Sequence, residues 1–126
     1  MRYVVPVILG IVAVIHALPL AGVLGAGKLG QLYGTPVQDV GLELLLRHRA
    51  VLFGLLAAFL GYAALRPELH RLALVAGLVS VVSFLWLSWL QRGSALSAPL
   101  MTVARVDAVA LALLVVAVAV HLRRSA

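Results

Sequence analysis

Four long apolar stretches dominate this sequence, and they leave few alternatives for its fold. They cover residues 4–24, 44–65, 72–90 and 103–122. Each is close to the roughly 20 residues that an α-helix needs to cross the hydrocarbon core of a bilayer. A soluble domain could not bury this much apolar surface, because 64% of the residues are hydrophobic and only 11% are charged. The sequence therefore predicts an all-α integral membrane protein with four transmembrane helices.

The connections between these stretches are short. They predict a single membrane domain over residues 1–126, a four-helix bundle with up-down-up-down topology. The first stretch is longer than the core of a signal peptide and lacks a clean cleavage site, so we expect it to be a retained span. No cysteine is present and the four histidines have no metal-ligand spacing, so we expect no metal and no other cofactor. No motif indicates an enzyme.

The basic residues indicate the orientation in the membrane. The end of the bundle that holds both termini carries arginines with few acidic neighbours: Arg2, Arg66, Arg71, Arg123 and Arg124. By the positive-inside rule this predicts a bacterial cytoplasmic (inner) membrane protein with both termini in the cytoplasm. The net charge of +6 is spread over helix ends rather than along one stripe. We therefore expect membrane lipids, and no nucleic acid, as partners.

Small and aromatic residues mark surfaces where helices or lipids could make contact. Gly54 with Ala58, and Ala108 with Ala112, have the small-xxx-small spacing that lets helices approach closely. Such pairs serve packing inside one bundle, or contacts to a membrane-protein partner or in a homo-oligomer. Trp86 and Trp89 are three residues apart and so share a helix face. They are typical of interfacial anchors, with ligand stacking as the alternative.

Ionisable residues near the end of the bundle away from the termini are the candidates for function. His16 lies deep in the first span, where such groups are costly and usually functional. Its alternative role is to donate to the backbone carbonyl that Pro19 leaves unpaired. Glu43 and Arg47 are four residues apart and predict an intrahelical ion pair. Arg49 is rotated by about 200° from Arg47, so one of the two arginines should point inward.

The fourth span begins with Arg105 and Asp107. Asp107 is either a partner of the positive end of its own helix or the counter-ion of Arg47 or Arg49. We expect a polar pocket at this end of the bundle, roofed by the loop over residues 25–41. The candidate ligand-binding residues are His16, Tyr33, Arg47, His48, Arg49, Arg105 and Asp107. The alternative is that these charges form a solvated cluster or only set the packing of the helices.

The pattern resembles small four-helix bacterial membrane proteins of the DoxX-like group. The resemblance spans the whole chain and rests on Leu32-Tyr33-Gly34, residues 47–54, Ser83-Phe84 and Arg105-x-Asp107. That group contains quinone-oxidase accessory subunits and maturation partners, which implies a similar role here. Some near relatives are expected to carry the label phosphopantetheine adenylyltransferase. That soluble family has a Rossmann-type fold and a TxGH-like motif, and this chain has neither.

Two functions follow from these patterns. The first is an integral membrane accessory or interaction protein, whose helix faces dock another membrane subunit. The alternative is a binding or transport protein whose pocket, at the non-cytoplasmic end, receives a small molecule, a lipid headgroup, a quinone or a proton. The small size of the chain favours the first.

Overall fold

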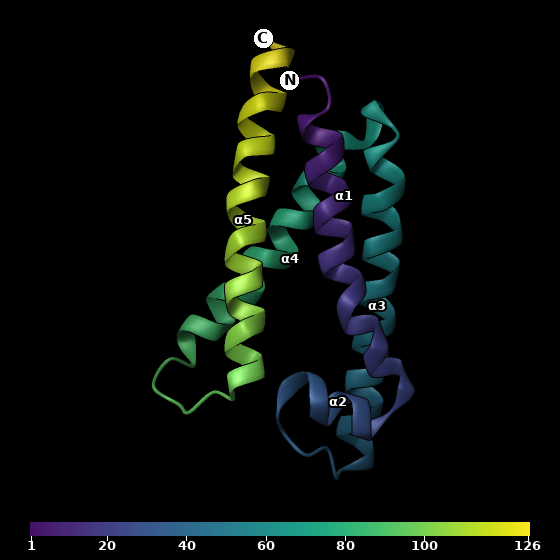
Figure 1. The fold of residues 1–126 in the computed structure, drawn as a ribbon, viewed down its shortest axis with the longest axis vertical. Coiled ribbons are helices and arrows are strands. Elements are labelled where there is room, and N and C mark those ends of the chain that lie inside the picture. Colours follow the sequence, from purple (N-terminus) through teal and green to yellow (C-terminus); the bar gives the residue numbers. More distant parts are fainter.

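The computed structural model describes residues 1–126, and helices account for nearly all of its regular structure (Figure 1). Its elements are α1 (Val4–Ala17), the 3-10 helix η1 (Leu18–Leu24), α2 (Ala26–Tyr33), α3 (Val40–Ala64), the 3-10 helix η2 (Pro67–Leu69), α4 (His70–Leu90) and α5 (Ala98–Ser125). Four helical segments are long and apolar enough to cross a membrane: α1 with η1, α3, η2 with α4, and α5. The predicted all-α four-helix bundle is confirmed, and the chain is a multi-pass membrane protein.

The helices alternate in direction, so both termini lie at the same end of the bundle (Figure 1). We call this the terminal end; it also holds η2. The opposite end, where the short helix α2 lies, we call the α2 end. The closest packing joins α1 to α3 and α4 to α5, and α1 also contacts α5. Helix α1 therefore connects the two pairs.

The core is small and the outer surface is apolar. The fully buried side chains include Leu9, Leu60 and Leu114, whereas Leu55 and Val115 in the same helices are exposed. Large exposed apolar side chains along every span are expected of helices that contact lipid rather than water. In the core, Gly77 brings α4 close to α5, since a Cβ there would lie 3.3 Å from a methyl carbon of Leu114.

Pro19 changes the geometry at the end of α1. Proline lacks the N–H that an α-helix would use to bond the carbonyl of Ile15. The N–H of Leu18 donates to the Ile15 carbonyl instead, and the chain continues as the 3-10 helix η1. The alternative role proposed for His16, bonding the carbonyl freed by Pro19, was wrong because tightening of the backbone already satisfies that carbonyl.

Helix α2 replaces most of the loop that was expected over residues 25–41. Leu32 and Tyr33 lie three and four positions after Leu29, so both are its neighbours on the helix surface. Leu29 is fully buried and packs closely against Gly22. Gly25 and Gly34, at φ angles of 117° and 65°, bound the helix at its two ends. Two glycines therefore delimit a helix within the segment that was expected to form a loop.

Helices α3 and α5 begin earlier than the apolar stretches at residues 44 and 103. The side chain of Asp39 accepts a hydrogen bond from the N–H of Leu42 at 2.7 Å, and Ser97 accepts one from the N–H of Leu100 at 3.4 Å. These N-caps satisfy free backbone donors. The two helices therefore start before the apolar segment, which was the only part that hydropathy could locate.

The junction of α2 and α5 yields a first testable prediction. Gly34→Ala should destabilise the protein by about 1 to 2 kcal/mol, because Gly34 has a positive φ. The added Cβ would also lie 2.9 Å from Pro99. A Cβ at Gly27, inside α2, would meet no other atom, so Gly27→Ala should be neutral or slightly stabilising. Amide hydrogen exchange of α2 would measure both effects, and equal protection in the two variants would contradict the prediction.

Candidate functional site

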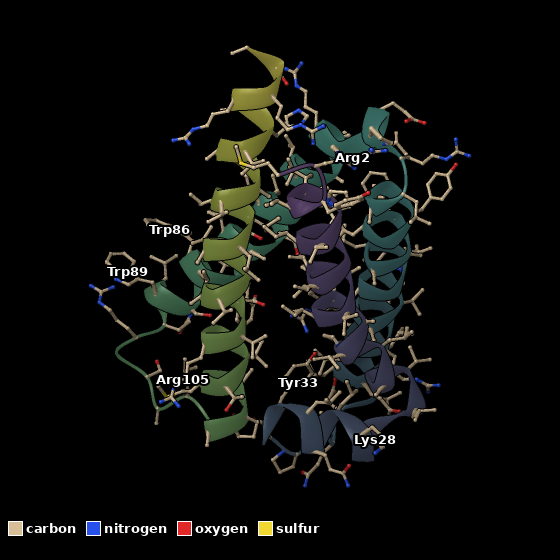
Figure 2. The ribbon with its side chains drawn as sticks, turned by 45° about the horizontal axis from the view of Figure 1, so that its top comes forward. Arg2, Lys28, Tyr33, Trp86, Trp89 and Arg105 are labelled. Carbon is tan, nitrogen blue, oxygen red and sulfur yellow. The ribbon has the colours of Figure 1, made fainter.

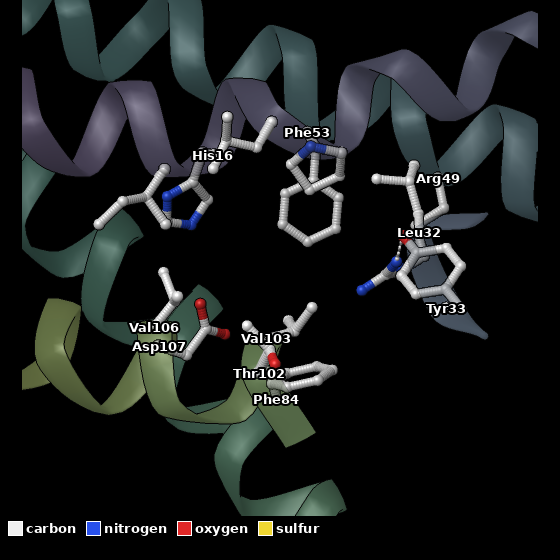
Figure 3. A pocket seen from close by; sticks show the side chains of 13 residues that line it. His16, Leu32, Tyr33, Arg49, Phe53, Phe84, Thr102, Val103, Val106 and Asp107 are labelled. Carbon is white, nitrogen blue, oxygen red and sulfur yellow. Dashed lines mark hydrogen bonds between the residues drawn. The ribbon is translucent and has the colours of Figure 1, made fainter. Parts of the chain in front are cut away.

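A partly open pocket of about 190 Å³ lies between the helices at the α2 end (Figure 3). Its walls are mostly apolar. The polar side chains that line it include His16 of α1, Tyr33 of α2, Arg49 of α3 and Asp107 of α5. Four of the seven candidate residues, from four different helices, are thus brought to one pocket.

His16 is almost completely buried, with 3% of its surface exposed. Its Nδ1 lies 2.8 Å from the carbonyl oxygen of Val12, and its Nε2 lies 2.9 Å from the hydroxyl of Ser80 in α4. Because a carbonyl can only accept, we assign the proton to Nδ1, and in the neutral ring Nε2 then accepts from Ser80. Both nitrogens are satisfied, so His16 links α1 to α4 while it lines the pocket.

Arg49 points inward and is held by two aromatic rings. Its Nη1 donates to the hydroxyl of Tyr33 at 2.6 Å. Its guanidinium carbon lies 4.6 Å from the ring centroid of Phe53 and 5.5 Å from that of Tyr33. These contacts combine a hydrogen bond with cation–π attraction. They fix the guanidinium at the pocket wall, where only part of its hydrogen-bonding capacity is used.

Arg47 points away from the pocket, as the helical rotation between the two arginines predicted. Its Nε donates to the carbonyl of Val23 at 3.0 Å, and its Nη1 lies 3.6 Å from the carboxylate of Glu43. The predicted ion pair between Glu43 and Arg47 is confirmed. Arg47 therefore ties the start of α3 to the end of η1 and does not line the pocket.

Asp107 lies across the pocket from Arg49 and makes no ion pair (Figure 3). The side-chain ion pairs of the chain are Glu43–Arg47 and Arg66–Glu68. Neither of the two alternative roles for Asp107 is observed. Tyr33 and Phe53 hold Arg49 on the opposite wall, and the start of α5 at Ala98 places Asp107 well beyond the first turn of its helix. The Asp107 carboxylate is directed into the pocket, with hydrogen-bonding capacity that no protein group uses.

His48 and Arg105 lie outside the pocket. Both are exposed, and Figure 2 shows Arg105 on the outer side of α5. His48 is one position from Arg49, which rotates it by about 100° around the helix. Arg105 is two positions from Asp107, which rotates it by about 200°. Closeness in sequence to Arg49 and Asp107 therefore did not imply closeness in space.

Two aromatic residues of the pocket, Phe53 and Phe84, were not among the candidates. Phe53 could have been identified, because it lies four residues after Arg49 and so shares its helix face. Phe84 carries no such signal, since only the crossing of α4 behind α5 brings it to the pocket. Helix α2 is fixed there by Ser97, whose hydroxyl donates to the carbonyl of Tyr33.

The exposed tryptophans lie on α4 outside this pocket (Figure 2). The rings of Trp86 and Trp89 stack with their centroids 5.2 Å apart, which confirms that they share a helix face. Arg92 lies 3.9 Å from the ring centroid of Trp89. An exposed aromatic pair beside an arginine is the arrangement of interfacial anchors.

The link between His16 and Ser80 can be tested by mutation. Ser80→Ala should destabilise the bundle by about 1 kcal/mol, because it leaves a buried ring nitrogen without a partner. Ser83→Ala removes a hydroxyl that bonds the carbonyl of Ser80 at the surface and should have a smaller effect. Unfolding in mixed detergent micelles would measure both. An equal loss in the two variants would rule out a structural role for the His16–Ser80 bond.

No family model, curated protein or solved structure matches the chain. The resemblance to the DoxX-like group therefore stays a prediction that rests on its motif residues.

Proposed function

We propose that the protein binds a lipid-soluble molecule with a ring-sized polar head, and that this molecule is a membrane quinone or quinol. The observation that carries the proposal is the arrangement of Arg49 and Asp107 on opposite walls of one apolar pocket, without an ion pair between them. An ionisable group inside a membrane is costly unless it is paired, and Asp107 has no hydrogen-bond or ion-pair partner in the protein. A ligand that bonds to both would offset that cost.

The two charged groups favour a neutral ligand with both kinds of hydrogen-bonding group. Arg49 can only donate, so it would bond a ring carbonyl, and ionised Asp107 can only accept, so it would bond a ring hydroxyl. An anionic headgroup would be attracted to Arg49 but repelled by the carboxylate of Asp107 in the same small pocket. This contrast makes a quinone–quinol pair a better candidate than a lipid phosphate at the α2 end.

The size and lining of the pocket agree with a ring. A volume of about 190 Å³ suits one or two fused rings and excludes a whole lipid. Phe53 and Phe84 line the pocket with aromatic surface that a flat head would contact. Because the pocket is partly open, an isoprenoid-like tail could extend between the helices into the bilayer. The proposed role is to hold the quinone and present it to a partner in the membrane.

Native mass spectrometry of gently extracted protein tests this proposal. We expect one quinone mass per chain, and displacement of that mass by an added short-tailed benzoquinone. A photoreactive quinone should label α2, α3 or α5 near Tyr33. A chain that retains no quinone, and that binds none when the short-tailed compound is added in excess, would contradict the proposal.

The second candidate function is the accessory or interaction role. One observation favours it: Ala108 and Ala112 remain exposed on α5, so their small-xxx-small spacing is not used inside the bundle. Gly54, by contrast, packs against Leu20 of η1. Recovery of the chain with another membrane subunit, lost on Ala108→Leu but kept on Val109→Leu, would support this role. It is compatible with quinone binding.

We also propose a bacterial inner-membrane location with both termini in the cytoplasm, which the arginines of the terminal end support. The natural absence of cysteine makes this easy to test. In intact cells, a membrane-impermeant maleimide should label Ser94→Cys, at the α2 end, and leave Ser125→Cys unlabelled. The reverse pattern would mean that the orientation is inverted.

A further inference from the structure

A second pocket lies at the terminal end, far from Arg49 and Asp107. Its volume is about 500 Å³, and it is formed where the start of α1, the turn before α4 and the last turns of α5 meet. Its polar lining includes Arg2, Tyr3, His70, His121 and Arg124. No acidic side chain lines it, so its electrostatic character is positive. Figure 2 shows Arg2 at this end of the bundle.

His70 is the unusual residue of this pocket. It is the first residue of α4, only 5% of its surface is exposed, and its Nε2 is buried without any hydrogen-bond partner. Buried polar atoms in folded proteins are nearly always paired, so an unpaired one requires an explanation. The N-terminus of α4, with the positive end of its helix dipole, lies at the same position. We assign the ring proton to Nε2, which makes this atom a donor from which an anion at this positive site would accept a hydrogen bond.

The two arginines supply the charge that such an anion would need. Arg124 extends across the pocket to the start of the chain, where its Nη1 donates to the carbonyl of Arg2 at 3.4 Å. This contact brings two guanidinium-bearing residues from opposite ends of the sequence to one site. Arg124 also interacts favourably with the negative end of the α5 dipole, because it lies in the last turn of that helix. That role does not explain the unpaired nitrogen of His70.

We propose that this pocket binds a phosphate group, held by Arg2 and Arg124. Nε2 of His70 has almost no exposed surface in this structure, so the ring would turn toward the phosphate to donate a hydrogen bond to it. Guanidinium groups bind phosphate through paired, charge-assisted hydrogen bonds. The phosphate belongs either to an anionic phospholipid headgroup or to a soluble phosphate. The volume of the pocket exceeds that of one phosphate group and leaves room for the glycerol part of a headgroup. The proposal does not depend on quinone binding at the α2 end.

A charge-matched pair of double variants tests the role of the arginines. Native mass spectrometry of the wild type should retain phosphatidylglycerol in preference to phosphatidylcholine. Arg2→Gln with Arg124→Gln should weaken this binding at least about tenfold. Arg71→Gln with Arg123→Gln removes the same charge from exposed positions outside the pocket and should change it less than about twofold. Equal losses in both double variants would overturn the proposal, since they would mean diffuse surface attraction.

The imidazole of His70 reports on the source of the phosphate. In a zwitterionic detergent, nitrogen NMR of the ring should show a shift of Nε2 when the ligand binds. A shift with inorganic phosphate identifies a soluble phosphate, and a shift only with phosphatidylglycerol identifies the headgroup. If neither compound shifts Nε2, the proposal is wrong. His70→Phe keeps a ring in the core and should abolish binding of the compound that shifts Nε2, and retained binding would remove His70 from the site.

Discussion

Replacing Arg49 with glutamine is expected to weaken quinone binding by roughly 10- to 150-fold. The guanidinium lies against Phe53 and donates to Tyr33, with its remaining donors available at the pocket wall. Charge-assisted hydrogen bonds of this kind contribute about 1.5 to 3 kcal/mol each, which corresponds to that range of Kd. Titration with a short-tailed benzoquinone, followed by native mass spectrometry, would measure the loss.

Arg47 offers a matched control for this experiment. Arg47→Gln removes the same charge from the same helix, but Arg47 bonds the carbonyl of Val23 and pairs with Glu43 outside the pocket. We expect the affinity of the Arg47→Gln variant for the quinone to stay within about threefold of that of the wild type. Equal losses in the two variants would mean that the arginines act only through overall charge, and the assignment of Arg49 to the site would fail.

Arg49→Lys should recover only part of the affinity, because an ammonium group keeps the charge but loses the planar stacking on Phe53. Since Asp107 forms no ion pair with Arg49, the stability effects of Arg49→Gln and Asp107→Asn should add within about 0.5 kcal/mol. Rescue of Arg49→Gln by Asp107→Asn would instead mean that the two residues pair in the membrane.

Leu114→Ala is expected to cause the largest loss of stability, about 2 kcal/mol. Leu114 is fully buried and its methyl groups face Gly77 in α4. In a bilayer the unfolded helices are already surrounded by hydrocarbon, so the cost comes from lost packing and the resulting cavity rather than from transfer out of water. This places the effect at the lower end of the range for buried leucines. Unfolding in mixed detergent micelles would measure it.

The control for Leu114 is a leucine that contacts lipid. Leu55→Ala removes the same atoms from an exposed position in the middle of α3. Because lipid surrounds this side chain in the folded and the unfolded state, we expect a change of less than about 0.5 kcal/mol. A loss at Leu55 as large as that at Leu114 would mean that Leu55 is covered, and would point to an oligomer or a partner subunit on that face.

Local spacing along one helix predicted several features of the α2 end correctly. The ion pair between Glu43 and Arg47 and the opposite directions of Arg47 and Arg49 follow from 3.6 residues per turn, which the backbone enforces whatever surrounds the helix. Contacts between helices were not predictable in this way. The hydrogen bond between the Ser80 hydroxyl and His16 joins residues 64 positions apart, and no pattern around either residue indicates the other.

The sequence by itself determined the four spans and their alternating direction. Backbone groups in hydrocarbon must bond within their own helix, so a long apolar stretch has almost no other structure available. Only the tertiary structure decided that Tyr33 and Phe53 hold Arg49, that Asp107 stays unpaired, and that Nε2 of His70 lies buried without a partner. The physical reason is that apolar helices pack by shape. Small differences in van der Waals contact set their crossings, and those crossings determine which polar side chains meet.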